Sequence, residues 1–399
     1  MGERNPESNE QIRNRRILEV AGVFLRLGFT AFGGPAAHVA LMEEELVRRR
    51  NWVSLEEFLD LLGITNLIPG PNSTEMALFL GQRRAGLPGL LAAGFAFILP
   101  AAVLTGGLAW AYLRWGRLPE LRGILAGLQP VILLIITQAV FSLGRTALKT
   151  RCHAGIGLAA CAGLVGGVHE LVVLAGSGLA GLWILTRSNA DARITPPKLA
   201  AVPMLGGWAT AAGSSAATIP FVPFSIGKLF LFFLKVGSVL FGSGYVLLAF
   251  LRTDLVERWH WLSEQQLLDA FAVGQATPGP LFTTATFIGF ILGGPVGAIA
   301  ATVGIFLPAF FWVAAGGRII DRLFKSTPAR AILDGLNAAS WSLMSVVALQ
   351  LAARVEWTVF SVVILAGSAW ALFRWRVPSI WPMVAAGSSG WVAGTFGWI

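Results

Sequence analysis

Asn66-Leu-Ile-Pro69-Gly70-Pro71-Asn72-Ser73-Thr74-Glu75 decides the fold, and the other half of the chain holds a second copy, Gln275-Ala-Thr277-Pro278-Gly279-Pro280-Leu-Phe-Thr283-Thr284. A helix cannot continue through Pro-Gly-Pro, because proline donates no backbone hydrogen bond and glycine readily adopts other conformations. The flanking residues are apolar, so each copy predicts a helix broken inside a membrane. Such backbone survives at that depth only when it is buried in protein or lines a wet cavity. Broken helices at matching positions of two halves point to a transport site.

The composition is that of a membrane protein. Of the 399 residues, 55% are hydrophobic and only 13% are charged, whereas soluble chains carry roughly a quarter charged residues. Several uncharged runs reach the roughly 20 residues that a spanning helix needs. We therefore predict an all-α polytopic membrane protein. The uncharged runs cover 86–113, 123–144, 199–227, 270–317, 335–353 and 377–399.

The net charge of +9 does not indicate nucleic-acid binding. The basic residues lie in short loops between apolar spans, which is the placement described by the positive-inside rule. Enzyme signatures are also missing from the sequence: Gly227-Lys228 is followed by leucine rather than by the Ser or Thr of a phosphate-binding loop. Neither His-Glu-x-x-His nor Gly-x-Ser-x-Gly occurs. We predict neither an enzyme nor a cofactor or metal site.

The two halves of the chain are copies of each other. Residues 24–80 align without a gap with the sequence 209 positions further on, so that Phe24 falls on Phe233. One position slips near residue 85, after which Gly127 falls on Gly335. A duplication of this length is a firmer sign of architecture than any single motif.

The duplication sets the expected domain boundaries. We predict a cytoplasmic tail over residues 1–16 and a first transporter repeat over 17–198. A linker over 199–227 is long enough for one extra span, and the second repeat runs over 228–399.

The charge pattern predicts that the two repeats are inverted. Arg83-Arg84 and the loop from Arg145 to Arg151 are basic, whereas their counterparts in the second half are almost neutral. Positive loops stay on the cytoplasmic side, so equivalent loops lie on opposite faces of the membrane. We expect about 10–13 membrane helices, with broken or re-entrant helices at Gly33-Gly34-Pro35 and at both Pro-Gly-Pro breaks.

Two basic residues occupy the same position in the two copies. Arg26 and Lys235 each lie within an apolar helix, where a cation is expensive unless it faces a cavity or a partner. A pair of symmetry-related cations can hold a divalent oxyanion at one central site. Alternatively, each lies near the membrane surface and extends its charged end to the lipid headgroups.

The breaks themselves are candidate oxyanion sites. The N-terminus of a helix presents free N–H groups and partial positive charge, which bind anions without a charged side chain. Hydroxyl and amide groups cluster around both breaks, although the alternative is that they only satisfy backbone groups freed by the break. The candidate binding residues are Asn66, Pro69, Gly70, Pro71, Asn72, Thr74, Gln275, Thr277, Pro278, Gly279, Pro280, Thr283 and Thr284.

The first copy alone carries titratable groups near its breaks. Glu75 is the one acid there, and Thr284 holds the equivalent position. Glu75 is either a proton-coupling group or the ion-pair partner of a nearby arginine. His38 either titrates near neutral pH or is a hydrogen-bonded structural residue. Together with Gly33, Gly34 and Pro35, these residues are the candidates for coupling and gating.

The motifs around these breaks resemble the chromate ion transporter family in its long, two-domain form. Phe-Thr-Ala-Phe-Gly33-Gly34-Pro35 with Asn66 to Glu75 is similar to the amino-terminal domain. Phe-Leu-Lys235-Val-Gly-Ser-Val-Leu-Phe-Gly242 with Gly274 to Gly289 is similar to the carboxy-terminal domain. The resemblance implies a multi-pass protein of a bacterial-type inner membrane that exports chromate, driven by the proton gradient. It also implies functional roles for Gly33, Pro35, Arg26, Lys235 and the residues of both Pro-Gly-Pro breaks.

Three functions remain open on the sequence. The residues themselves lead to an oxyanion transporter, and chromate comes from the resemblance alone. A transporter of sulfate or another oxyanion is the second interpretation, since chromate and sulfate share charge and shape. A passive anion channel is the third. The expected partners are the oxyanion, protons, the lipid bilayer and a second copy in a homodimer, with no nucleic acid.

Overall fold

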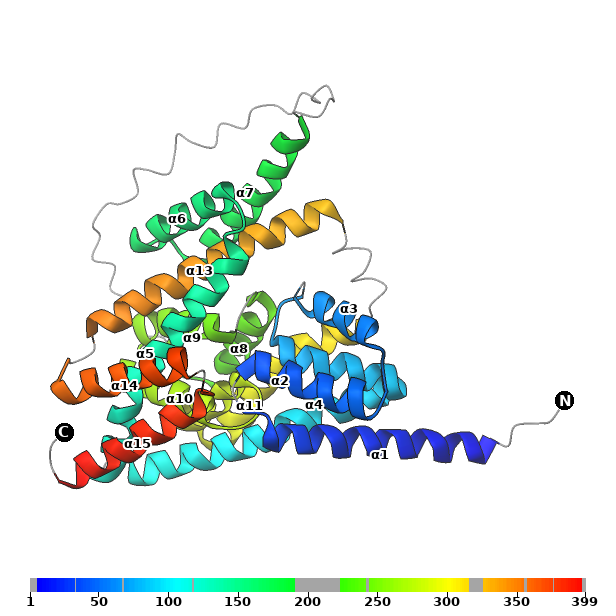
Figure 1. Ribbon diagram of the computed structural model, residues 1–399, viewed down its shortest axis with the longest axis horizontal. Helices are drawn as coiled ribbons and strands as arrows, with labels where there is room; N and C mark the ends of the chain where they lie inside the picture. Colours follow the sequence, from blue (N-terminus) through cyan, green and yellow to red (C-terminus); the bar gives the residue numbers. More distant parts are fainter. Residues whose placement is uncertain are drawn as a thin grey trace.

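The computed structural model describes residues 6–32, 34–66, 68–116, 118–190, 223–241, 244–315, 326–354, 357–375 and 377–396. These residues form helices and short connections, with no β-strand among them (Figure 1). The predicted all-α class is therefore confirmed. Gly33 and most of the predicted linker, residues 199–222, lie outside the described residues.

The described residues of the first half form eight helical elements in an order that the second half repeats. The predicted tail is helical from Pro6 onward. The elements of the first half are α1 (Pro6–Thr30), α2 (Gly34–Met42), η1 (Glu43–Arg49), α3 (Leu55–Thr65), α4 (Asn72–Trp115), α5 (Pro119–Ala147), α6 (Arg151–Val165) and α7 (Glu170–Ala190).

The second half repeats this order after the linker. A continuous helical run over 244–258, made of η2, α9 and η3, corresponds to α2 and η1. The elements are α8 (Ile226–Val239), η2 (Gly244–Val246), α9 (Leu247–Leu251), η3 (Arg252–Arg258), α10 (Glu264–Ala276), η4 (Leu281–Thr283), α11 (Thr284–Ala315), α13 (Thr327–Arg354), α14 (Val359–Arg374) and α15 (Ile380–Thr395).

Each break is the tip of a helical hairpin. Glu19 on α1 contacts Arg50, just past η1, at 3.5 Å, so α1 and the α2–η1 run fold back on each other. Glu57 near the start of α3 contacts Arg83 on α4 at 3.4 Å. Because these contacts join residues far from the breaks, the Gly-Gly-Pro and Pro-Gly-Pro segments lie at the tips, as expected for re-entrant helices.

The helices that follow the Pro-Gly-Pro breaks fold back a second time. In α4 the reversal falls at Ala85 and Gly86, where Gly86 has φ +67°. A Cβ atom added to Gly81 would overlap the carbonyl oxygen of Gly89, so the two arms pack face to face through glycine. The same reversal in α11 falls at Gly293 and Gly294, with Gly289 packed on Gly297.

The long arms of α4 and α11 pack against each other in opposite directions. A Cβ atom added to Gly94 would overlap the ring of Phe310, near the end of α11. A Cβ atom on Gly106 would lie 4.0 Å from Thr286, whose hydroxyl is 2.7 Å from that of Thr302. Residues later in α4 therefore contact residues earlier in α11, so the two arms run antiparallel.

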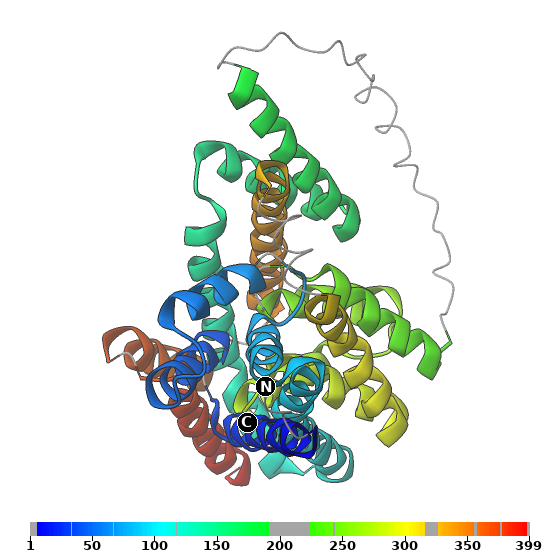
Figure 2. The ribbon, with the colours of Figure 1, turned by 90° about the vertical axis from the view of Figure 1, so that its right-hand side faces the viewer.

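The remaining helices form an outer layer that crosses between the halves. Helix α5 packs along α15, and α13 packs along α7 (Figures 1 and 2). Small residues allow the close approach: Cβ atoms added to Gly127 and Gly335 would overlap the carbonyl oxygens of Ala386 and Ser177, respectively. The last helix of each half, α7 or α15, thus packs against a helix of the other half.

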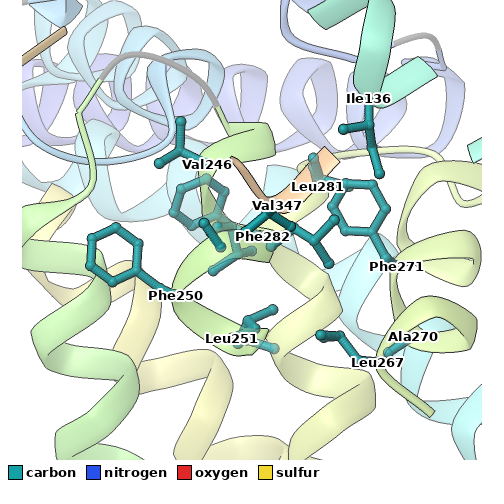
Figure 3. Packing of buried hydrophobic residues seen from close by; sticks show 14 of the residues in the cluster. Ile136, Val246, Phe250, Leu251, Leu267, Ala270, Phe271, Leu281, Phe282 and Val347 are labelled. Atoms are coloured by element: carbon teal, nitrogen blue, oxygen red, sulfur yellow. The ribbon is translucent and has the colours of Figure 1, made fainter. Parts of the chain in front are cut away.

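Two hydrophobic cores result. One joins the hairpins of the second half to α5, α6, α7 and α13, and Figure 3 shows Val246, Phe250, Leu281 and Phe282 within it. The other holds the hairpins of the first half together with Ala309 from α11. The hairpins of the first half therefore form a largely separate body.

Serine side chains cap the starts of α3 and α10. The Ser54 side chain accepts a hydrogen bond from the Glu57 backbone N–H at 3.1 Å. Ser263 and Gln266 form a reciprocal capping box.

Four stretches of the described residues are long and apolar enough to cross a membrane. The shorter helices include the arms of re-entrant hairpins, so the expected total of membrane helices stays a prediction. The four stretches are Asn72–Trp115, Gly123–Ala147, Leu281–Ala315 and Thr327–Ala353, and shorter apolar helices cover Arg151–Val165, Glu170–Thr186 and Val359–Arg374.

Candidate functional site

The two Pro-Gly-Pro tips are held by a reciprocal pair of backbone hydrogen bonds. The Gly70 N–H donates to the carbonyl of Leu240, which follows α8 in the other half, at 2.9 Å. The Gly279 N–H donates to the carbonyl of Ala31, which follows α1, also at 2.9 Å. Ala31 and Leu240 are equivalent in the repeat, as are the two glycines. Each half therefore completes the tip of the other.

The geometry of these tips requires glycine. Gly70 and Gly279 have φ values of +142° and +91°, in the region that other residues avoid. A Cβ atom on Gly279 would also lie 2.7 Å from the Cβ of Ala101 on α4. A Cβ atom on Gly70 would overlap Oε1 of Glu75. The flanking prolines Pro69, Pro71, Pro278 and Pro280 are all buried.

A small cavity lies where four helix N-termini converge. Its volume is about 60 Å³, against the ~10–15 Å³ that a single water requires on a comparable measure. Pro35 opens α2, Gly244 opens the 244–258 run, and the other lining residues open α4 and the η4–α11 run. The lining residues are Pro35, Pro71, Asn72, Ser73, Gly244, Leu281 and Phe282.

The electrostatics of this cavity come from the backbone. The first N–H groups of a helix have no intrahelical acceptor, and each N-terminus carries roughly half a positive charge. Four such ends around one cavity favour an anion, although none of the described lining side chains is charged. Asn72 is fixed at the rim by a 2.6 Å hydrogen bond from its side chain to that of Asn66.

Most candidate hydroxyls satisfy the backbone near the breaks. Thr277 donates to the carbonyl of Val273 at 3.0 Å. Thr283 donates to Pro280 at 2.9 Å, and Thr284 donates to Leu281 at 2.8 Å. These hydroxyl hydrogens are therefore engaged.

Among the candidate hydroxyl and amide groups, two carry an atom that remains unpaired within the described part of the chain. The Thr74 hydroxyl is fully buried and has no partner there, and neither has the Nε2 of Gln275. The Gln275 side chain does form a hydrogen bond with Tyr245. A Cβ atom on Gly34 would lie 3.4 Å from the Tyr245 hydroxyl. These contacts place polar groups of the second half beside the Gly-Gly-Pro tip of the first.

Glu75 is buried without a partner among the described residues. Its side chain is 0% exposed, and neither carboxyl oxygen has a hydrogen bond or an ion pair with any of them. It lies in the first turn of α4, with one oxygen against the Cα of Gly70. The expected alternative, an ion pair with a nearby arginine, is not formed in the described ranges. A buried acid beside a helix break in a membrane protein is a candidate for function.

His38 lies beside the second tip contact. It is 1% exposed and hydrogen-bonds the backbone of Ala31, the residue that accepts from Gly279. Its Nδ1 atom has no partner in the described residues, and its ring packs edge-on against Phe97 at 5.8 Å. His38 therefore has a structural contact and one ring nitrogen to which none of these residues binds.

The two repeated cations form repeated ion pairs. Arg26 lies 3.9 Å from Glu45, and Lys235 lies 2.5 Å from Asp254. Glu45 and Asp254 occupy equivalent positions, so the repeat in the sequence already carried a signal for these pairs. Neither cation is among the residues that line the central cavity. Each cation thus forms an equivalent ion pair within the first hairpin of its own half. We call the end of this hairpin that carries the pair its base.

The pair in the second half belongs to a larger network. Asp254 also accepts from Arg258 at 2.7 Å, and Arg258 reaches Glu170 at the start of α7 at 3.0 Å. The Arg258 guanidinium also lies 2.9 Å from the His169 ring. This network joins the second half to the first, a link that position-by-position sequence reasoning did not predict.

Taken together, the fold and the site define a class of protein: a helical membrane transporter built from two repeats that meet at broken helices. A family model described as "Chromate transporter" matches residues 18–182 and again 227–391. The chain belongs to the chromate transporter family.

Individual relatives agree with this assignment. The chain is 31% identical to the chromate transport protein of Pseudomonas aeruginosa over 379 residues, which cover 92% of this chain and 90% of the relative. It is 28% identical to the chromate transport protein of Cupriavidus metallidurans over 373 residues, with the same coverage. The uncharacterized transporter YwrA of Bacillus subtilis is 31% identical over 126 residues, covering 32% of this chain and 71% of YwrA. No solved structure matches the chain.

Proposed function

We propose that this protein exports chromate, or a divalent oxyanion like it, across a bacterial-type inner membrane, and that the proton-motive force drives the export. The observation that carries the proposal is the cavity of about 60 Å³ at which helix N-termini from both halves converge. Four ends of roughly half a charge each match a dianion. Chromate as the substrate follows from the names of the relatives.

Two further features support a transporter of the inverted-repeat kind. The equivalent long arms of α4 and α11 run antiparallel, as two halves of opposite orientation require. The small cavity beside the broken helices is lined by residues of both repeats, which supports a binding site between them. A passive channel is the weaker interpretation, because direct backbone hydrogen bonds join each tip to the other half where the two repeats meet.

Glu75 is the proposed coupling group. An ionised carboxylate and an oxyanion at the N-terminus of one helix repel each other, so the anion binds more tightly when Glu75 is protonated. A dianion exported with one proton still carries one negative charge outward, which is the direction that the membrane potential favours. None of the described cations pairs with Glu75 to relieve that repulsion. His38, whose Nδ1 has no partner among the described residues, is the proposed second proton carrier at the facing tip.

The test is accumulation of radiolabelled chromate in everted membrane vesicles, with vesicles lacking the protein as control. We expect uptake that collapses when a protonophore is added, and uptake that excess sulfate does not suppress would identify chromate as the substrate. Uptake abolished by sulfate would make the protein a general oxyanion transporter, because backbone donors hardly distinguish the two ions. No uptake above the control would contradict oxyanion transport.

The coupling role has its own variant. Glu75→Gln keeps the shape of the side chain and removes its titration. We expect this variant to lose the dependence of chromate uptake on external pH and on the protonophore. Glu57→Gln is the matched control, since Glu57 is a partly exposed acid that pairs with Arg83 on the same hairpin. A Glu75→Gln variant with the pH profile of the wild type would remove Glu75 from the coupling mechanism.

A further inference from the structure

The hairpins of the second half are docked on the outer helices. Helix α10 packs against α5 and α15, and η2 and α9 pack against α13. Gln265 on α10 accepts a 2.8 Å hydrogen bond from Gln129 on α5. Arg252, only 2% exposed, donates to Gln350 on α13 at 2.5 Å.

The hairpins of the first half lack the equivalent docking. Within the described residues, helix α3 packs on α4 and η1 and makes no comparable packing with α13 or α7. Leu59 on α3 is 53% exposed, whereas its equivalent Leu268 packs against the core. Asp60 is exposed, whereas its equivalent Asp269 is buried and accepts a 2.8 Å hydrogen bond from Tyr112 of the long α4 arm.

The Gln129–Gln265 pair that docks the second half has an equivalent polar pair on the side of the first hairpins. The repeat places Glu56 at the position of Gln265 and Asn337 at the position of Gln129. Glu56 is exposed and Asn337 is partly buried, and they form no hydrogen bond with each other in the described part of the chain. A carboxylate and an amide are complementary, so α3 and α13 carry a potential docking pair that this conformation does not use.

From these observations we propose that the two halves exchange roles during transport. In the exchanged state the hairpins of the first half dock on α13, and Glu56 accepts a hydrogen bond from Asn337. The hairpins of the second half leave α5, and the bond between Gln265 and Gln129 breaks. The inference rests on the proposed transport function, since it supplies the alternation of access that a transporter requires.

The open side of the present state is visible beside α3. A polar pocket of about 260 Å³ lies between α3 and α4. The equivalent space beside α10 is occupied by α5 and α15. Exchange closes the first space and opens the second, and in inverted repeats these lie on opposite faces of the membrane. The pocket residues include Ser54, Glu56, Glu57, Asp60 and Arg83.

The near equivalence of the halves keeps the two states close in free energy. Both states bury one docked and one undocked set of equivalent hairpins, so their free energies differ only through the residues that differ. An equilibrium of this kind is shifted by a ligand according to its differential affinity for the two states. The Arg258–Glu170 ion pair has no counterpart on the undocked side, because Pro378 occupies the position equivalent to Glu170 in the second half.

The experiment uses disulfide formation between paired cysteines in the full chain, in everted vesicles. The native Cys152 and Cys161 are first replaced by serine. Gln129→Cys with Gln265→Cys reports the present state, and Glu56→Cys with Asn337→Cys reports the exchanged state. Glu57→Cys with Asn337→Cys is the control, because Glu57 faces Arg83 instead.

We expect both reporting pairs to cross-link under mild oxidation, several-fold faster than the control pair. Chromate should change the two rates in opposite directions, and each disulfide should stop uptake until it is reduced. The exchange is overturned if the Glu56→Cys and Asn337→Cys pair cross-links no faster than the control while its reduced form still transports chromate.

The same cysteine pairs separate this inference from the proposed function. If the reduced variants and the wild type take up no chromate, the substrate assignment fails. The rates without substrate still decide the exchange: cross-linking of both reporting pairs above the control supports it, and cross-linking of the Gln129→Cys and Gln265→Cys pair alone overturns it.

Discussion

The tips of the two halves share their backbone and differ in their side chains. Gly70 and Gly279 make equivalent hydrogen bonds to equivalent carbonyls, yet Glu75 and His38 stand in the first half where the second has Thr284 and Leu247. Both halves thus contain the backbone geometry of the proposed anion site, whereas only the first contains the titratable groups. The proposed binding belongs to the pair of repeats, and the proposed coupling belongs to the first repeat.

The bases of the first hairpins differ in the opposite sense. Asp254 is 3% exposed at its side chain and takes part in a network that reaches α7. Glu45 is 11% exposed, and its partners Arg26 and Arg49 are mostly exposed. Ion pairs therefore connect the hairpins of the second half to α7, whereas the ion pairs of Glu45 stay within the hairpins of the first half.

The largest effects should come from the shared backbone. Gly279→Leu and Gly70→Leu each force a side chain onto a positive φ, which costs about 1–3 kcal/mol, and into occupied space. We expect chromate uptake by each variant to fall by at least about tenfold, since ~1.4 kcal/mol corresponds to that factor. Gly22→Leu is the control, because an added Cβ there meets no described atom within 4 Å. Normal uptake kinetics in either tip variant would remove the tips from the site.

An intermediate effect should distinguish the two hairpin bases. Asp254→Asn leaves Lys235 and Arg258 without their shared carboxylate, and we expect a loss of about 1–3 kcal/mol. Glu45→Gln removes pairs with the exposed Arg26 and Arg49 and with the partly exposed Arg50, and we expect a smaller loss of about 0–1 kcal/mol. Thermal unfolding of the purified protein in detergent measures both. Equal decreases in melting temperature for the two variants would show that the two carboxylates contribute equally to stability.

The repeated cations give a related comparison in activity. Arg26→Gln and Lys235→Gln should each lower chromate resistance at unchanged membrane abundance, and the Lys235 variant should lose more because its pair is closer and more buried. Resistance assays with immunoblots of the membrane fraction measure this. Full resistance in the Lys235 variant would leave the cation without a role in transport.

The smallest effect concerns the pH dependence of stability. The hydrogen bond from Arg50 holds the pKa of the Glu45 carboxyl below its ordinary value of 4.5. A lowered pKa means that the ion pair stabilises the fold above that value and stops doing so as the pH falls through the folded pKa. The melting temperatures of the wild type and Glu45→Gln should therefore converge in acid and separate at neutral pH. A constant difference across this window would contradict the contribution of Glu45.

Features that are local or repeated could be predicted from the sequence. Pro-Gly-Pro excludes a continuous helix by itself, and Ser54 and Ser263 cap the helices that follow them. The duplication was visible because equivalent residues keep a constant separation. The family followed from the same motifs and is confirmed by the match of both halves to one family model.

Features that depend on the chain folding back could not be predicted in this way. Nothing local to Gly81 shows that Gly89 packs against it, because a helix of this length is equally compatible with one straight span. The hydrogen bond from Gly70 to Leu240 joins residues 170 positions apart, and backbone groups leave no trace in residue type. Roles for Arg26 and Lys235 in the site remain predictions, since their ion pairs became visible only with the fold.

The reciprocal hydrogen bonds at the tips also bear on how such a chain arises. In a polypeptide with one repeat, the glycine N–H and the helix-end carbonyl both lack the partner that the other half supplies here. Two such polypeptides complete both tips at once if they meet in opposite orientation. Gene duplication and fusion then add a fixed stoichiometry. Once fused, one copy is free to lose Glu75 and His38 through mutation, as long as the other keeps them.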